Sequence, residues 1–165
     1  MKLDIGCGDK KNENSIGIDV ERTPNTDVLA SADSFMPFKD DTFDEIFCYH
    51  ILEHSKDLLF TMNEIWRISK DNSRIHIRVP YFESIYAFSD PTHKNFFTEK
   101  TIEFFCVNDR FFSYKRKGQK FILVRQSFFS PNPILRFFVG NRILRRLYFG
   151  RFVSEMRIEI QPVKQ

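Results

Sequence analysis

The first 80 residues of the chain alternate short apolar segments with polar or glycine-containing turns. Five of the apolar segments have the length and composition of strands, and they cover residues 2–5, 15–20, 27–32, 43–49 and 74–80. Between the last two, residues 58–68 carry apolar side chains near the 3.6-residue spacing of a helix. Strands that alternate with helices and turns are typical of an α/β domain with a mainly parallel sheet.

The second half continues the pattern over longer polar interruptions. Helices are predicted over 98–105, with Thr98 as the N-cap, and over 133–151, and strands over 121–125 and 156–163. The last two strands have no other strand between them, so they can form an antiparallel edge. We therefore expect a single domain over residues 1–165, α/β in class, with a Rossmann-like sheet.

One face of this sheet is expected to be partly uncovered. Residues 75–79 and 156–160 alternate apolar and charged or polar side chains. Strands that are covered on both faces show nearly continuous apolar runs instead.

The segment Asp4-Ile5-Gly6-Cys7-Gly8 is the strongest local signal for a ligand site. A short apolar strand ends there in two glycines one residue apart, so that the backbone can approach a ligand closely. Asp19 follows at the end of the second strand, where a carboxylate can accept hydrogen bonds from two ribose hydroxyls. This combination predicts a nucleotide-type pocket.

Five segments in order resemble the motifs of class I S-adenosylmethionine-dependent methyltransferases, in particular those that methylate small molecules. They are Asp4 to Gly8, Asp19, Asp33 to Phe38, Phe43 to Ile46, and Leu52-Glu53-His54. The resemblance spans roughly residues 2–80 and implies S-adenosylmethionine as the cofactor. Residues 1–80 would then form the cofactor-binding half, and residues 81–165 the substrate and lid half with the last strands.

The resemblance also implies where the cofactor lies. The residues that it places there are Asp4, Gly6, Cys7 and Gly8 at the methionine part, Asp19 at the ribose, Asp33 and Phe35 at the adenine, and Tyr49 or His50 beside the sulfonium.

The connection after the glycine loop is shorter than in the family. Only residues 9–14 separate Gly8 from the second strand, where a helix of about 11 residues is usual. We expect the first helix to be reduced or absent, and the site to be open, weakly binding, or covered by the second half or a second subunit of a homo-oligomer. The alternative is a non-catalytic, cofactor-binding or degenerate methyltransferase-like partner subunit.

Residues 50–54, His-Ile-Leu-Glu-His, also match the H-x-x-E-H pattern of inverted zinc metallopeptidases. That site needs both histidines on one helical turn, with the glutamate as general base. His50 instead falls at the end of a predicted strand, and the Leu-Glu-His ending of the methyltransferase motif explains the same residues. No metal is therefore expected.

The loop beyond the fifth predicted strand is where the acceptor is expected. His93 is the candidate catalytic base, because an imidazole titrates near neutral pH, and Tyr81, Tyr86 and Asp90 are candidates to bind the substrate. Alternatively, Asp90 and His93 only stabilise a turn before the next helix. Residues 79–98 resemble methyltransferases of glycan and surface-polysaccharide pathways, which implies a sugar or a lipid-linked glycan as the small-molecule acceptor.

Charge is distributed unevenly along the chain. Residues 1–54 carry five Lys/Arg and twelve Asp/Glu, whereas residues 110–151 carry eleven Lys/Arg and no acid. Arg142, Arg145 and Arg146 share one face of the helix predicted over 134–151. The interpretation that we favour is an amphipathic helix that packs its apolar side on the sheet. The second interpretation is peripheral contact with a membrane surface or with a lipid-linked substrate. Nucleic acid is an unlikely partner because no RNA-binding module accompanies the charge, so an RNA methyltransferase is the second alternative.

A cytoplasmic location is expected. The N-terminal residues lack the apolar run of a signal peptide, and the sequence has no stretch of about 20 apolar residues. The three cysteines, Cys7, Cys48 and Cys106, suit thiols in a reducing compartment.

Overall fold

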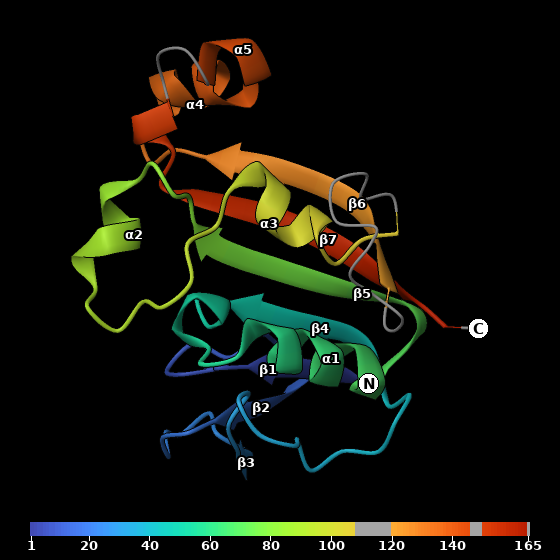
Figure 1. Ribbon diagram of the computed structural model, residues 1–165. Helices are drawn as coiled ribbons and strands as arrows, with labels where there is room; N and C mark the ends of the chain where they lie inside the picture. The colour runs from blue at the N-terminus through green and yellow to red at the C-terminus, as the bar shows by residue number, and fades with distance from the viewer. Residues whose placement is uncertain (108–119, 146–149, 165) are drawn as a thin grey trace.

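The computed structural model describes residues 1–107, 120–145 and 150–164 (Figure 1). Strands and helices alternate over most of this length, as the sequence pattern predicts. The strands are β1 (Lys2–Ile5), β2 (Ser15–Asp19), β3 (Val28–Leu29), β4 (Phe43–Tyr49), β5 (Ser69–Pro80), β6 (Lys120–Phe129) and β7 (Glu155–Val163). The helices are α1 (Leu58–Ile68), α2 (Ile85–Ser89), α3 (Glu99–Glu103), α4 (Pro133–Gly140) and α5 (Arg142–Leu144), with the 3₁₀ turns η1 (Leu52–His54) and η4 (Gly150–Phe152).

The seven strands form one sheet in the order β3-β2-β1-β4-β5-β7-β6. The first five strands pair in parallel, and β7 is antiparallel to both of its neighbours. The predicted α/β fold with a mainly parallel sheet and an antiparallel edge is confirmed. The sequence pattern does not reveal that the last strand lies inside the sheet, between β5 and β6.

The parallel strands place their carboxyl ends at the same edge of the sheet, on the left in Figure 1. The link from β1 to β2 contains no helix, in agreement with the predicted reduction of the first helix. Helix α1 follows β4 and begins at Asp57, whose side chain accepts a hydrogen bond from the amide of Phe60. Helix α2 lies beyond the carboxyl end of β5. The same edge therefore carries the loops after β1, β2, β4 and β5.

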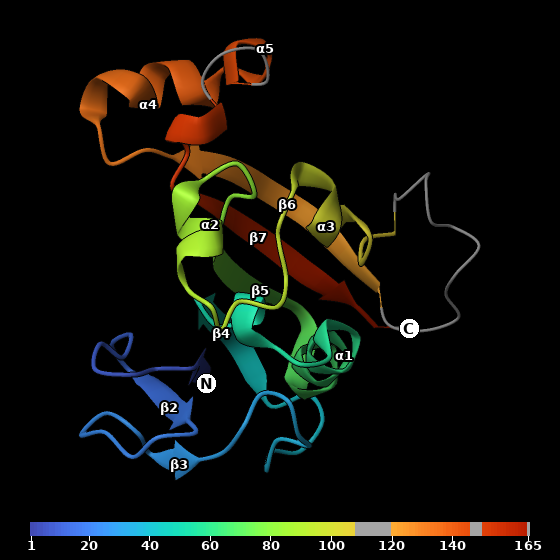
Figure 2. The same cartoon turned by 60° about the vertical axis from the view of Figure 1, so that its left-hand side comes forward.

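The hydrophobic core lies between the sheet and the helices α1 and α3, which cover the same face in both views (Figures 1 and 2). Residues of β5 and β7 that point toward this face are buried, whereas their neighbours along each strand are partly exposed. On the second face His76 stacks on Phe47 and bonds Glu45, and Arg78 lies 4.0 Å above the Tyr49 ring. The predicted uncovered face thus carries polar and aromatic side chains.

Two predicted elements differ from the structure. The strand expected over 27–32 is reduced to Val28–Leu29. The helix expected over 133–151 breaks at Asn141, because the Asn141 side chain accepts hydrogen bonds from the amides of Ile143 and Leu144 and so starts a new helix. Residues 146–149, including Arg146, lie outside the described part of the chain.

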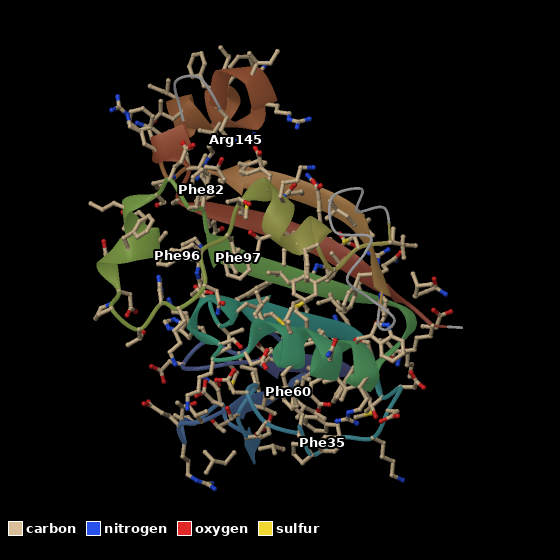
Figure 3. The ribbon with its side chains drawn as sticks, in the orientation of Figure 1. Phe35, Phe60, Phe82, Phe96, Phe97 and Arg145 are labelled. Carbon is tan, nitrogen blue, oxygen red and sulfur yellow. The ribbon has the colours of Figure 1, made fainter. Side chains whose placement is uncertain are left out.

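Arg145 also departs from its predicted place on a solvent-exposed basic face. Its side chain is buried, bonds a carboxylate oxygen of Glu99 at 2.6 Å and lies 3.4 Å above the ring of Phe128. Figure 3 shows it at the base of α4 and α5. Arg145 therefore joins this helical pair to the rest of the domain. Within the described residues, no helix is long and apolar enough to cross a membrane.

Candidate cofactor and acceptor site

The glycine loop between β1 and β2 turns through two residues of left-handed conformation. Gly6 has φ +70° and Gly8 has φ +46°. The amides of Gly6 and Cys7 both donate to the carbonyl of Ile18 in β2, which holds the loop against the neighbouring strand end. A Cβ atom on Gly8 would meet no atom within 4 Å, so the space beside this residue is open. The loop therefore offers its backbone to a ligand.

Asp19 lies directly beside this loop. Its Oδ2 atom accepts a hydrogen bond from the amide of Gly8 at 2.9 Å, and its Oδ1 atom accepts one from the amide of Glu21 at 3.0 Å. An ionised carboxylate has about four lone-pair positions, so each oxygen can accept a further hydrogen bond. The acid predicted to bind the ribose hydroxyls is thus fixed in place and still able to accept two more donors.

Asp4 and Cys7 support the loop from inside. Asp4 is buried, which raises its pKa, and its Oδ2 atom accepts hydrogen bonds from the amide and the side-chain nitrogen of Asn12. The Cys7 side chain is buried and lies 3.6 Å from the carbonyl oxygen of Asn25. Asp4 thus holds the turn that replaces the first helix, and Cys7 joins the glycine loop to the loop after β2.

The segment predicted to meet the adenine is anchored to η1 and α1. Asp33 accepts hydrogen bonds from the Ser55 hydroxyl and the Lys56 amide. Phe35 is 69% exposed at the lower end of the molecule in Figure 3, with the guanidinium of Arg67 4.0 Å from its ring centre. Arg67 also donates to the carbonyls of residues 36 and 38, so it fixes the course of this segment. Asp33 and Phe35 thus belong to the same anchored loop.

The end of β4 directs two predicted site residues to different places. His50 has the left-handed φ of +54° and lies between two carboxylates, with Glu155 at 3.0 Å from Nε2 and Glu53 at 3.2 Å from Nδ1. These two acids, Glu155 first, raise the pKa of His50 to about 9. Tyr49 points instead to the uncovered face of the sheet, beneath Arg78, where it lines a separate hollow of about 260 Å³.

A larger cavity of about 660 Å³ opens at the carboxyl ends of β4 and β5. Its lining residues are His50, Glu53, Pro80, Tyr86, Ser89, Asp90, Pro91, His93, Ser154 and Glu155. Tyr86, Asp90 and His93 therefore lie where the sequence places the acceptor. Tyr81 does not, because its ring is buried in the core against Phe82 and Phe128.

His93 has a defined orientation at this cavity. Its Nδ1 atom lies 2.9 Å from the carbonyl oxygen of Ala87, which can only accept, so Nδ1 carries the hydrogen. The Nε2 atom then carries the lone pair. Its distance of 3.9 Å to Asp90 Oδ2 is too long for a hydrogen bond.

Glu155 and Ser154 line the cavity although nothing in the sequence pattern marks them. They precede β7, and the antiparallel pairing of β7 with β5 brings Glu155 opposite Pro80. Glu53 lines the cavity as well, and two signals in the sequence mark Glu53 and His54: the Leu-Glu-His ending and the H-x-x-E-H spacing.

Comparison with known proteins identifies the fold. A family model described as a methyltransferase domain matches residues 3–77. A solved S-adenosylmethionine-dependent methyltransferase from Archaeoglobus fulgidus shares 20% identity at a TM-score of 0.62, over 97% of this chain and 85% of that one. A second methyltransferase, from Mesorhizobium loti, shares 10% identity at a TM-score of 0.63, over 97% of this chain and 89% of that one. The [4+2]-cyclase SpnF shares 14% identity at a TM-score of 0.63, over 99% of this chain and 74% of that one. No curated protein sequence matches the chain significantly.

The chain thus has the fold of S-adenosylmethionine-dependent methyltransferases, and its residues 3–77 match the model of a methyltransferase domain. S-adenosylmethionine is the cofactor named for the solved methyltransferases that share this fold. The site fits this cofactor in two respects, since the space beside Gly8 is open and the carboxylate of Asp19 is fixed beside it.

Proposed function

We propose that the protein transfers the methyl group of S-adenosylmethionine to an oxygen or nitrogen atom of a small polar acceptor, with a sugar as the preferred class. The observation that carries this proposal is the cavity of about 660 Å³ at the carboxyl ends of β4 and β5. Pockets for small molecules have volumes of roughly 300–1,000 Å³. Residues 1–80 would hold the cofactor and residues 81–165 would supply most of the acceptor side within one domain.

On the cofactor side, Gly6 and Gly8 present the backbone, and Asp19 accepts hydrogen bonds from the ribose hydroxyls. Asp4 and Cys7 act by holding the loop, and Asp33 with Phe35 borders the adenine. When bound, the cofactor supplies an electrophilic methyl group on a positively charged sulfur. Positioning of the acceptor therefore matters more than acid–base chemistry.

On the acceptor side, the polar lining favours a hydroxylated ligand. Tyr86 is 58% exposed and offers an aromatic face, while Asp90 and Glu155 can accept hydrogen bonds from hydroxyl groups. His93 lines the same cavity. Carboxylates at three lining positions make the cavity unsuitable for a phosphate backbone, which argues against an RNA acceptor.

An acceptor carried on a lipid is supported by exposed apolar side chains on α4 and α5. Ile134, Phe137 and Ile143 are 72%, 80% and 69% exposed. We propose that these residues touch the membrane surface, with the protein itself in the cytoplasm, where its cysteines remain thiols. Flotation with anionic lipid vesicles tests this contact. Phe137→Ser should reduce co-flotation, and equal recovery of the variant and the parent would contradict it.

The competing function is that of a non-catalytic partner subunit. The fold alone does not fix methyl transfer as the function, because the cyclase SpnF has the same fold. Calorimetric titration with the demethylated cofactor decides between the two. Asp19→Asn should weaken binding by about 10- to 100-fold, since hydrogen bonds to a charged group contribute roughly 1.5–3 kcal/mol. Asp9→Asn, an exposed change nearby, is the matched control.

The catalytic part of the proposal needs a transfer assay. The protein is incubated with methyl-labelled cofactor and a panel of free sugars, nucleotide sugars and lipid-linked sugars, and label in the product is counted. We expect label in at least one sugar, and much less of it with Asp19→Asn when the cofactor is below the concentration that saturates the parent. Absence of cofactor binding at millimolar concentration would overturn the proposal, and label only in RNA would replace the acceptor class.

A further inference from the structure

We propose that Glu53, His54 and His93 form a binding site for a divalent transition-metal ion, with Zn²⁺ as the best-suited ion. Each residue offers one ligand atom, and these three atoms lie within 4.8 Å of one another. Zinc bonds of roughly 2.1 Å place tetrahedral ligand atoms about 3.4 Å apart, so small side-chain rotations complete the site. These residues come from η1 and from the loop after α2.

The ring of His93 is already oriented for a metal ion. Its Nδ1–H is donated to the backbone carbonyl of Ala87 at 2.9 Å, and its side chain is only 8% exposed. Metal-binding histidines usually donate the second ring nitrogen to a carbonyl or carboxylate in this way, which fixes the ring and exposes the other lone pair. Nε2 of His93 is thus prepared for a cation.

His54 has the same arrangement through a side chain. Its Nδ1 atom lies 2.9 Å from the hydroxyl oxygen of Thr92, and that hydroxyl donates its one hydrogen to Asp90 at 2.7 Å. Nδ1 of His54 must therefore be the donor to Thr92, and Nε2 carries the lone pair. The two imidazole rings lie 4.7 Å apart. Two histidines thus expose the same kind of nitrogen side by side.

Glu53 has one carboxylate oxygen that lacks a partner. The residue is 1% exposed, and its Oε1 atom is hydrogen-bonded to Nδ1 of His50. Among the described residues, Oε2 is a buried oxygen without a hydrogen-bond partner. A buried carboxylate oxygen without a donor is unfavourable and calls for a ligand. A cation between Glu53 and the two histidines satisfies it.

The backbone holds the three ligands together before any ion binds. The amides of Lys94 and Asn95 both donate to the carbonyl of Glu53, at 2.8 and 3.0 Å. The Asn95 side chain donates to the carbonyls of Leu52 and Ser55. The loop that carries His93 is therefore fastened to η1 on both sides of Glu53.

This set differs from the H-x-x-E-H zinc pattern considered from the sequence. Both ring nitrogens of His50 are occupied by Glu53 and Glu155, so His50 orients the carboxylate and is not itself a ligand. Two histidines and one glutamate are the ligand set of catalytic zinc sites, which keep a further position open. Glu53 and His93 also line the acceptor cavity, so this position faces it.

The open position gives the ion a role that rests on the proposed function. A hydroxyl oxygen of the acceptor would bind there and be held toward the glycine loop, because hydroxyl oxygens are good ligands of a Lewis-acidic cation. Metal binding itself does not depend on that role. It can be measured without the cofactor, so its failure is distinct from a failure of methyl transfer.

The test is a titration of tag-free, chelator-treated protein with Co²⁺, which replaces Zn²⁺ and is coloured when bound in a low-coordinate site. Zinc content after equilibrium dialysis gives the stoichiometry. Glu53→Gln keeps the shape and the acceptor for His50, and His93→Asn removes a nitrogen ligand. His76→Gln is the matched control, since His76 pairs with Glu45 on the other face of the sheet. Circular dichroism confirms that each variant is folded.

We expect one ion per chain in the parent and in His76→Gln, with visible cobalt bands. Glu53→Gln and His93→Asn should each lower the affinity by at least about 100-fold and abolish the rise in melting temperature on zinc addition. Less than one-tenth of an ion per chain in the parent would overturn the proposal. So would unchanged affinity in Glu53→Gln, or a sulfur-to-cobalt charge-transfer band that places the ion on a cysteine.

Discussion

Replacing each of the two loop glycines with alanine should rank the two positions in opposite order: Gly6→Ala should reduce stability more, and Gly8→Ala should reduce cofactor binding more. Gly6 and Gly8 both have positive φ, and an alanine in this conformation is disfavoured by roughly 1–2 kcal/mol. Only at Gly6 does the new Cβ meet other atoms, at 2.9, 3.0 and 3.1 Å from Cδ1, Cγ1 and Cβ of Ile51. The last two atoms are close to the backbone and cannot swing away. Overpacking adds about 1–3 kcal/mol at this position.

We therefore expect Gly6→Ala to lower the free energy of unfolding by about 2–5 kcal/mol and Gly8→Ala by about 1–2 kcal/mol. Urea denaturation of both variants measures the difference. Adding Ile51→Ala should remove the contacts with Cδ1 and Cγ1 and leave only the 3.1 Å contact with Cβ. The double variant should therefore be more stable than the sum of the two single effects by about 1 kcal/mol or more. Ile51→Ala combined with Gly8→Ala is the control and should be additive.

Cofactor binding should follow the reverse order. The space beside Gly8 is open in the protein alone, and we propose that the cofactor fills it. A methyl group there should weaken binding of the demethylated cofactor by at least about tenfold, which corresponds to 1.4 kcal/mol. Equal losses of stability at Gly6 and Gly8, or additivity of Gly6→Ala with Ile51→Ala, would refute the steric argument. Unchanged affinity in Gly8→Ala would refute the placement of the cofactor.

Three further predictions concern the rest of the domain. Arg67→Met should lower the free energy of unfolding in urea by about 3 kcal/mol, because it leaves the buried Glu64 carboxylate without its cation; Glu64→Gln in the same chain should restore part of the loss. Lys70 lowers the pKa of Asp44 from 3.8 to about 2, so the ionised carboxylate stabilises the folded state above pH 4 or so and this contribution is lost as the pH falls toward 2. Asp44→Asn should therefore make the urea midpoint less dependent on pH in that window, and an unchanged slope would contradict the pairing. Burial raises the pKa of the Cys48 thiol, so iodoacetamide should modify Cys48 only on unfolding, as mass spectrometry of timed samples can show.

The first half of the fold can be predicted from the sequence because its signals are local. The glycine pair marks the end of β1, Asp19 marks the end of β2, and apolar spacing with Asp57 before it marks α1. Each of these features depends on residues within about one turn or one strand of each other. The parallel pairing then follows from the alternation of strands with helices and long turns, and it places the proposed cofactor residues at one edge.

The second half depends on long-range contacts that no local pattern encodes. Arg145 has the spacing of a solvent-exposed helical face, yet its partner Glu99 lies 46 residues earlier and draws it into the interior. Tyr81 follows a strand end, as a site residue would, but its ring is buried against the adjacent Phe82 and against Phe128, which lies 47 residues later in the chain. Glu155 reaches the cavity only because β7 inserts between β5 and β6.

The interior position of β7 sets the order in which the molecule can be completed during synthesis on the ribosome. Strand β6 precedes β7 in the chain, and among the described strands it pairs with the sheet only through β7. Until residues 155–163 have left the ribosome, β6 has no strand to join, and the cavity lacks Ser154 and Glu155. The nascent protein can therefore assemble the cofactor half early, while the acceptor half forms in a late step of high contact order. A chain whose synthesis stops short of this strand would carry a glycine loop but no finished acceptor cavity.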